Sequence, residues 1–236
     1  GIPVRIGEFG GRRVAACQTR QSNLDTFDVV STLLRSGKLK HSVHLVLPVG
    51  VAWGAKPCAR GGDQRIGDVI VADMCINAGH VKFGFGYCCG GEEIRGAIPE
   101  CPLATSLNSL LFMDWPRRTQ SEFGKDRKYR IPDHPRRPQA HIGTVISLPA
   151  LVNNKRRALA LLNHKQIKPH RPIGGEMELY QIARAANAHF LPWLLTKTIC
   201  DWGGLAGPKN KVDQPMAAAA AADFADWLLR DRVKDA

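Results

Sequence analysis

The sequence contains no run of eighteen uncharged apolar residues and no hydrophobic leader, so we expect neither a membrane-spanning helix nor a secretory signal. Its seven cysteines form no CxxC pair and are odd in number, which argues against a disulfide framework. It also has no internal repeat. Together these absences favour a soluble, cytoplasmic protein whose thiols are reduced and which has no membrane partner.

Acidic residues are in the minority, with 21 Asp and Glu against 33 Lys and Arg and a net charge of +12. Part of the excess is local, because the span 117–137 is rich in Arg and Lys. Such an excess indicates a nucleic acid, a phosphorylated small molecule or simply a solvated surface. Only Trp115, Phe123 and Tyr129 offer stacking rings near this span, so nucleic acid is the weaker interpretation.

A length of 236 residues with 44% hydrophobic content suits one large α/β domain, residues 1–236, better than two small ones. Residues from about 86 to 140 are rich in Gly, Pro and Arg, and we expect them to form an insertion into that domain. The chain begins at Gly1 rather than Met, and its first residues already read as the approach to a strand. We therefore expect additional sequence upstream.

Apolar runs alternate with segments of helical periodicity, which is typical of an α/β protein. A hairpin is expected around Gly10 and Gly11, with buried strands at 44–49, 68–72, 141–148 and 190–200. Helices are expected from about residue 23, through 157–162, after an opening at Gly174 and Gly175, and from Pro215 onward through the alanine run 217–222. The last apolar strand ends at Asp201, and ligands of open α/β sheets bind at the carboxyl ends of strands.

Several separated motifs point to one known family. They are 50–54 (GVAWG) before 65–71 (RIGDVIV), then 175–178 (GEME), then 199–202 (ICDW). In that order, and over nearly the whole chain, they resemble the methylthioadenosine/S-adenosylhomocysteine (MTA/SAH) nucleosidases and the related purine nucleoside phosphorylases. The resemblance implies a three-layer α/β/α phosphorylase-like fold with a central mixed, partly barrel-like sheet, whose first strand is missing or truncated here.

The resemblance also implies roles for single residues in cleaving the N-ribosidic bond of a purine nucleoside or nucleotide. Asp201 matches the family's general acid, which must stay protonated at neutral pH, as burial beside an apolar strand favours. Glu178 matches the carboxylate that accepts hydrogen bonds from both ribose hydroxyls, and Met177 is expected to pack on the sugar. Glu176 either binds ligand or caps the helix that follows.

Further substrate-binding residues are implied near the base. Leu151 and Val152 stand where the family places base-contacting apolar residues, although an ordinary core role is equally open. Ala52, Trp53 and Gly54 belong to the glycine-rich segment, in which backbone approaches ligand closely. Trp53 replaces a small residue of the family, so the choice of substrate is expected to differ.

The resemblance implies that two family features lie upstream of residue 1: the Glu that orients water in hydrolases and the phosphate-binding residues of phosphorylases. Three alternatives therefore stay open, namely hydrolysis, phosphorolysis with orthophosphate as co-substrate, and a non-catalytic nucleotide sensor within a larger, defence-related protein. The basic span offers arginines for the phosphates of a nucleotide such as ATP.

No other cofactor is expected, and no metal, because His41, His44, His80, Cys88 and Cys89 lack zinc-like spacing. Family members are commonly dimers or hexamers, so we expect a homo-oligomer.

Overall fold

The computed structural model describes residues 3–19, 23–36, 39, 42–55, 64–79, 82–83, 88–89, 97–98, 138–206 and 213–231. The basic span 117–137 lies outside these residues, as does most of the expected insertion at 86–140. The single-domain organisation therefore stays a prediction. The described part contains all the segments that carry the family motifs.

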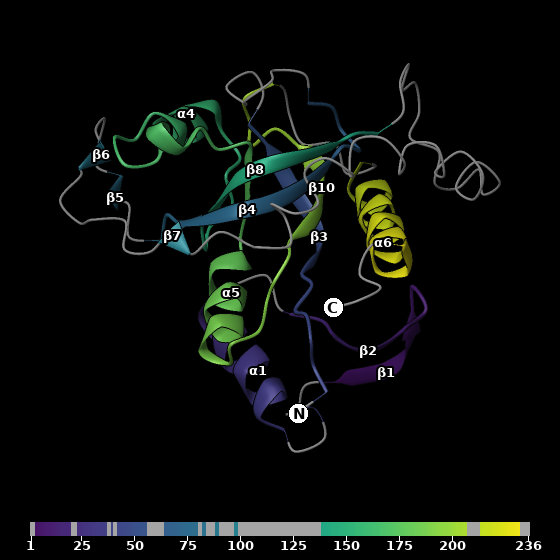
Figure 1. The fold of residues 1–236 in the computed structure, drawn as a ribbon. Helices are drawn as coiled ribbons and strands as arrows, with labels where there is room; N and C mark the ends of the chain where they lie inside the picture. Colours follow the sequence, from purple (N-terminus) through teal and green to yellow (C-terminus); the bar gives the residue numbers. More distant parts are fainter. Residues whose placement is uncertain are drawn as a thin grey trace.

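A six-stranded mixed sheet forms the centre of the molecule, in the spatial order β10-β3-β9-β8-β4-β7 (Figure 1). Strand β10 also pairs with β4, so β10, β3, β9, β8 and β4 close into a small barrel and β7 extends it at β4. The predicted mixed, partly barrel-like sheet is thereby confirmed. The strands are β3 (Val49–Gly54), β4 (Val69–Asn77), β7 (Ala97–Ile98), β8 (Ala140–Ser147), β9 (Gly174–Glu176) and β10 (Thr196–Asp201).

Both parallel and antiparallel pairs occur around this barrel. β10 runs parallel to β3, and β8 runs parallel to both β4 and β9, whereas β9 is antiparallel to β3 and β10 is antiparallel to β4. Residues 69–72 of β4 are fully buried, as expected for a strand covered on both faces. This burial explains the continuous apolar run that identified the strand in the sequence.

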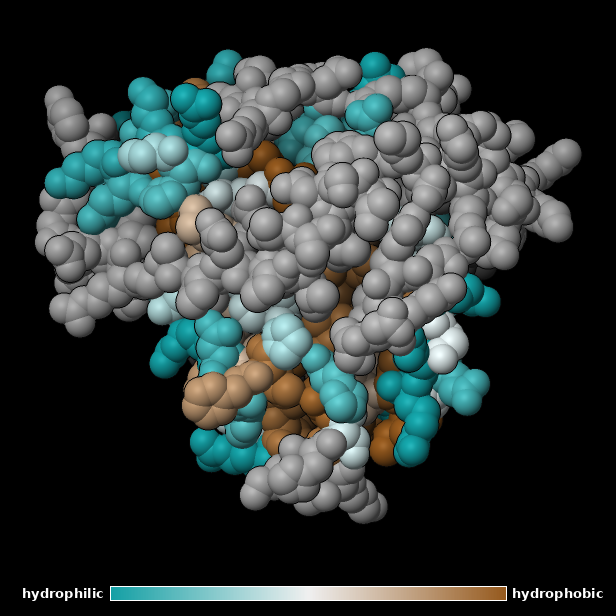
Figure 2. Space-filling model, in the orientation of Figure 1, coloured by the Kyte–Doolittle hydropathy of each residue, from teal (hydrophilic) through white to brown (hydrophobic). Residues whose placement is uncertain are grey.

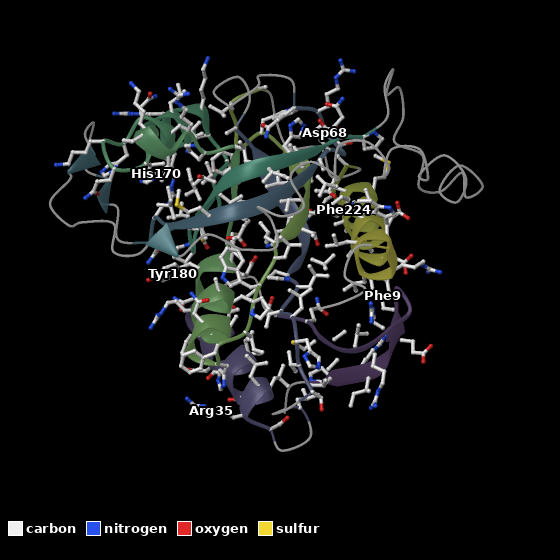
Figure 3. The ribbon with its side chains drawn as sticks, in the orientation of Figure 1. Phe9, Arg35, Asp68, His170, Tyr180 and Phe224 are labelled. Carbon is white, nitrogen blue, oxygen red and sulfur yellow. The ribbon has the colours of Figure 1, made fainter. Side chains whose placement is uncertain are left out.

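Helices flank the sheet on several sides (Figure 1). Helix α6 (Asp213–Asp231) packs on β10 and β3, and its Phe224 projects from the helix toward the sheet and is fully buried (Figure 3). Helix α5 (Leu179–Ala188) packs against α1 (Asn23–Arg35). Helix α4 (Lys155–Leu162) follows β8 at the upper left of Figure 1, and the short 3-10 helix η3 (Lys168–His170) comes after α4 in the chain. Among the described helices, none is long and apolar enough to cross a membrane.

The predicted amino-terminal hairpin is present as β1 (Val4–Phe9) and β2 (Arg12–Cys17), separate from the main sheet. Gly10 in its turn has a φ of +58°, and its N–H donates to Asp226 Oδ1 at 2.9 Å, which docks the hairpin on α6. A second small ribbon pairs β5 (Lys82–Phe83) with β6 (Cys88–Cys89). In Figure 2, hydrophobic residues gather between the α1–α5 pair and the side formed by α6 and the hairpin.

Three predicted boundaries were wrong. Residues 44–48 contain only one isolated bridge, from Val46 to Trp193, and the strand begins at Val49, so the glycine-rich segment is itself β3. Gly174 and Gly175 belong to β9, and the helix begins only at Leu179. The run 190–200 likewise becomes a strand only from Thr196. In each case pairing with a distant strand decided the boundary, and local periodicity does not report such pairing.

Candidate functional site

Asp201, Trp53 and Gly175 lie in register across three neighbouring strands. Asp201 at the end of β10 pairs with Trp53 of β3, and Trp53 pairs on its other side with Gly175 of β9. Gly175 immediately precedes Glu176, which leads into α5. The barrel therefore brings the carboxyl end of β10 and the β9–α5 junction to the two sides of one strand, β3.

The Asp201 carboxylate is half-buried and held by its own turn. Oδ1 accepts a hydrogen bond from the N–H of Gly203 at 2.9 Å, and the Cys200 thiol donates to Oδ2 at 3.4 Å. Gly203 has a φ of +59°, a left-handed conformation that glycine adopts without strain. This turn fixes the direction in which the carboxyl group leaves the strand.

Asp68, the residue just before β4, contacts the start of β8 through its carboxylate and β10 through its backbone oxygen. Asp68, labelled in Figure 3, accepts hydrogen bonds from the N–H groups of Arg65 and Gln139, each at 2.9 Å, and from His141 Nε2 at 2.8 Å. Its backbone oxygen accepts the N–H of Ile199 at 2.8 Å. The Asp68 network thus joins the starts of β4 and β8 to the segment that delivers Asp201.

Glu176 caps the start of α5. Its Oε2 accepts hydrogen bonds from the backbone N–H groups of Glu178 and Leu179, both at 2.8 Å. These N–H groups have no partner within the helix, and a carboxylate also interacts favourably with the helix dipole at this end. Of the two roles open in the sequence, capping is therefore observed, while Oε1 is buried without a hydrogen-bond partner.

Lys197 joins the two glutamates of the motif. Its Nζ lies 2.9 Å from Glu176 Oε2 and 2.8 Å from Glu178 Oε2, and the Lys197 side chain is only 7% exposed. Lys197 pairs in register with Gly50 of β3, and a Cβ on Gly50 would lie 3.7 Å from Lys197 Cε. The lysine stem therefore runs beside a glycine to reach the β9–α5 junction.

Burial and the neighbouring charges shift the pKa values of Lys197 and Glu178. Burial acts to lower the pKa of Lys197, but the two carboxylates more than offset it, so the pKa lies above its ordinary value of 10.5. Burial raises the pKa of Glu178 above its ordinary 4.5, Lys197 opposes the rise and Glu176 adds to it. Lys197 is therefore a cation at neutral pH, and Glu178 takes up a proton at a higher pH than a solvated glutamate does.

Lys197 was not among the site residues predicted from the sequence. One signal was available, because a lysine in the middle of the apolar strand 194–200 must either reach solvent or find a buried anion. The sequence of the strand gives no indication of which anion the lysine contacts. The two glutamates lie on a different element, some twenty residues earlier in the chain.

The other predicted site residues fall into two groups. Ala52, Trp53, Gly54 and Val152 are buried, and Met177 is half-buried between the two glutamates. Leu151 differs from them, because 49% of its surface is exposed. Val152 belongs to the same apolar cluster as Trp53, which agrees with its core interpretation. Whether any of these residues binds substrate stays a prediction.

No group of three or more His, Cys, Asp or Glu side chains able to hold a metal ion occurs in the described part of the chain. His41 and His80, two of the residues considered in the sequence, lie outside that part. The polar groups nearest the predicted site are Asp201 and the Lys197–Glu176–Glu178 cluster. A half-buried carboxyl group can exchange a proton with a ligand, and an ionised glutamate can accept hydrogen bonds from hydroxyl groups.

No protein-family model matches the chain, and no curated protein matches it in sequence. Solved structures do match. The MTA/SAH nucleosidase of Streptococcus pneumoniae in complex with 8-aminoadenine has a TM-score of 0.68 and 18% identity, covering 98% of this chain and 86% of its own. An Asp-to-Asn mutant of the Helicobacter pylori MTA nucleosidase, with 5′-methylthioadenosine in its active site, has a TM-score of 0.63 and 16% identity, covering 95% and 83%.

Futalosine hydrolase of Helicobacter pylori is a third such structure, with a TM-score of 0.61 and 15% identity over 97% of this chain and 88% of its own. At identities this low, the likeness establishes the architecture. The chain has the fold of the MTA/SAH nucleosidases and futalosine hydrolase, which is the nucleoside phosphorylase and nucleosidase fold.

Proposed function

We propose that the chain cleaves the N-ribosidic bond of a purine nucleoside or nucleotide, with water as the attacking group. The observation that supports this most directly is the placement of Asp201 and the β9–α5 junction on either side of one strand, within a fold shared with purine nucleosidases. Cleavage of this bond leaves positive charge on the sugar and negative charge on the departing base. A carboxyl group at Asp201 can give a proton to the base, and a carboxylate at Glu178 can interact with the sugar.

In this proposal Asp201 donates a proton to the departing base, and Glu178 accepts hydrogen bonds from the ribose hydroxyls. Lys197 is a positioning residue, because its ammonium group holds Glu178 Oε2 at 2.8 Å before any ligand arrives. Glu176 fixes the start of α5, from which Glu178 extends. Asp201 is held by its own turn and Glu178 by Lys197 of another element, so both carboxyl groups are oriented before ligand binds.

The test is a panel of adenosine, 5′-methylthioadenosine, inosine, AMP and ATP, each incubated with and without orthophosphate, with free base quantified by chromatography. We expect free base from at least one substrate in the absence of phosphate. A strict requirement for phosphate would show phosphorolysis instead. Nucleotide binding without release of base would show a sensor, and neither binding nor release would contradict the proposal.

The raised pKa of Glu178 predicts how nucleoside binding depends on pH. Because Glu178 must be ionised to accept two hydrogen bonds, nucleoside affinity should fall on acidification at a pH above the ordinary glutamate value of 4.5. The measurement is the nucleoside Kd against pH in the Asp201→Asn variant, where residue 201 does not titrate. A similar structure gives a precedent for this design, because an Asp-to-Asn mutant of the Helicobacter pylori enzyme holds 5′-methylthioadenosine in its active site.

Adding Glu178→Gln to the Asp201→Asn variant provides the control for this pH dependence. With glutamine at 178 the affinity should be weaker at neutral pH and independent of pH over the acid range, because the side chain has no proton to gain. An unchanged acid limb in the double variant would assign the titration to another group and remove Glu178 from ribose binding.

A further inference from the structure

Trp53 occupies the position between the two proposed binding groups. Its strand, β3, lies between β10, which ends at Asp201, and β9, which leads to Glu178. Neighbouring strands are about 4.8 Å apart, so β10 and β9 are separated by about 10 Å across β3. A ligand that extends from Asp201 to the β9–α5 junction must therefore pass Trp53.

Two glycines hold the indole ring along different edges. A Cβ on Gly175 would lie 2.5 Å from Trp53 Cζ2 and 2.7 Å from Nε1, so no side chain fits there while the ring keeps its place. A Cβ on Gly203 would lie 3.2 Å from Cδ2 and from Cε3. The large Trp53 side chain therefore fits because residues 175 and 203, on the two segments beside it, are glycines. A ring packed on both edges has little room to swing aside.

The same ring lies against the turn that holds the proposed acid. Gly203 donates its N–H to Asp201 Oδ1, and a Cβ on Gly203 would also lie 3.3 Å from Val152 Cγ1. Trp53 and Val152 belong to one apolar cluster. An aromatic ring, an apolar side chain and a proton donor therefore meet at the end of β10, which is the combination that a flat heterocyclic base requires.

We propose that the Trp53 indole is the specificity-determining wall of the base site, admitting an unsubstituted purine beside Asp201 and excluding purines with bulky ring substituents. This inference rests on the proposed function, because it identifies the ligand of that same site. A fixed wall rejects a substituent that has no space. One methylene group in such a pocket changes selectivity by about 10–200-fold.

The test measures binding of free bases, so that it does not depend on catalysis. Kd values for adenine, 6-benzylaminopurine and 8-bromoadenine are determined by calorimetry for the wild type and for Trp53→Ala, with Trp53→Phe as a milder variant if alanine unfolds the protein. Trp193→Ala is the matched control, because it removes another buried tryptophan, which bridges to Val46 before β10 begins. We expect Trp53→Ala to improve the affinity for at least one substituted purine, relative to adenine, by about tenfold or more, and Trp193→Ala to leave the ratio unchanged.

Gly175→Ala tests the same wall from the other side. Its Cβ would push the ring out of place, so adenine affinity should fall, and Trp53→Ala should restore it in the double variant. Gly7→Ala on β1, where an added Cβ meets nothing within 4 Å, is the control. If the affinity for substituted purines relative to adenine is the same in both Trp53 variants as in the wild type, the inference is overturned. Base release by the wild type is not affected by that result. Failure of every base to bind would overturn the inference, while release of base from the nucleoside panel would still decide the proposed function.

Discussion

Asp201→Asn is expected to lower the rate of base release by about 10²–10⁴-fold, because asparagine has no proton to give the departing base. Asparagine keeps the size of the side chain, and its carbonyl oxygen can still accept the N–H of Gly203, as Oδ1 does at 2.9 Å. The loss should therefore appear in kcat, with nucleoside affinity nearly unchanged. Release of free base under single-turnover conditions, together with the nucleoside Kd, measures the two effects separately.

Asp28→Asn provides the matched control, since it makes the same chemical change at an exposed position on α1. Its rate of base release should equal that of the wild type. If Asp201→Asn also equals the wild type, Asp201 is not the proton donor, and the acid must be sought elsewhere. If Asp201→Asn loses affinity as strongly as rate, its role is binding rather than proton transfer.

Lys197→Met is expected to destabilise the fold by about 3–5 kcal/mol, because removal of one partner leaves buried carboxylates without their cation. The Lys197 side chain is 7% exposed and its Nζ contacts both glutamates, so solvent cannot replace the lost interaction. Methionine fills a similar volume, which limits any cavity effect. The free energy of unfolding in urea measures the change.

Arg230→Met is the comparison for Lys197→Met. Arg230 forms an ion pair of equal length, 2.9 Å, with Asp226, but Arg230 is 59% exposed. Breaking such a surface pair should cost about 0.3–0.5 kcal/mol. A loss for Lys197→Met no larger than that for Arg230→Met would contradict the assignment of Lys197 as the buried counter-ion.

A positioning role for Lys197 predicts more than lost stability. Lys197→Met should also lower nucleoside affinity, because Glu178 loses the ammonium group 2.8 Å away. Lys197→Arg keeps the positive charge and should recover most of that affinity. If Lys197 only stabilised the fold, Lys197→Arg would restore the free energy of unfolding but would not restore nucleoside affinity. Measuring Kd beside the unfolding free energy separates the two cases.

The local pattern of the sequence was sufficient for several elements. Glycine at a hairpin turn, the apolar run that begins β4 and the alanine run of α6 each reflect a short-range rule of backbone freedom or burial, and all three elements are present. The resemblance carried by the segments at 175–178 and 199–202 led to the correct architecture. It also named the two carboxyl groups that lie on either side of β3.

Tertiary structure decided what those rules do not report. Whether Gly174 and Gly175 form a strand or open a helix depended on Trp53 and Gly54 being available to pair with them, more than a hundred residues away in the chain. The same pairing set the indole of Trp53 against Gly175. Both features are long-range, and periodicity within a short window contains no information about them.

The sequence by itself thus determined which residues are apolar, which segments turn and which carboxyl groups end their elements. Only the closed barrel, in which β10 pairs with β3 on one side and β4 on the other, decided that Lys197 meets Glu176 and Glu178. The physical reason is that a buried charge must find its counter-charge among whatever neighbours the strand order supplies, and that order is a property of the whole sheet.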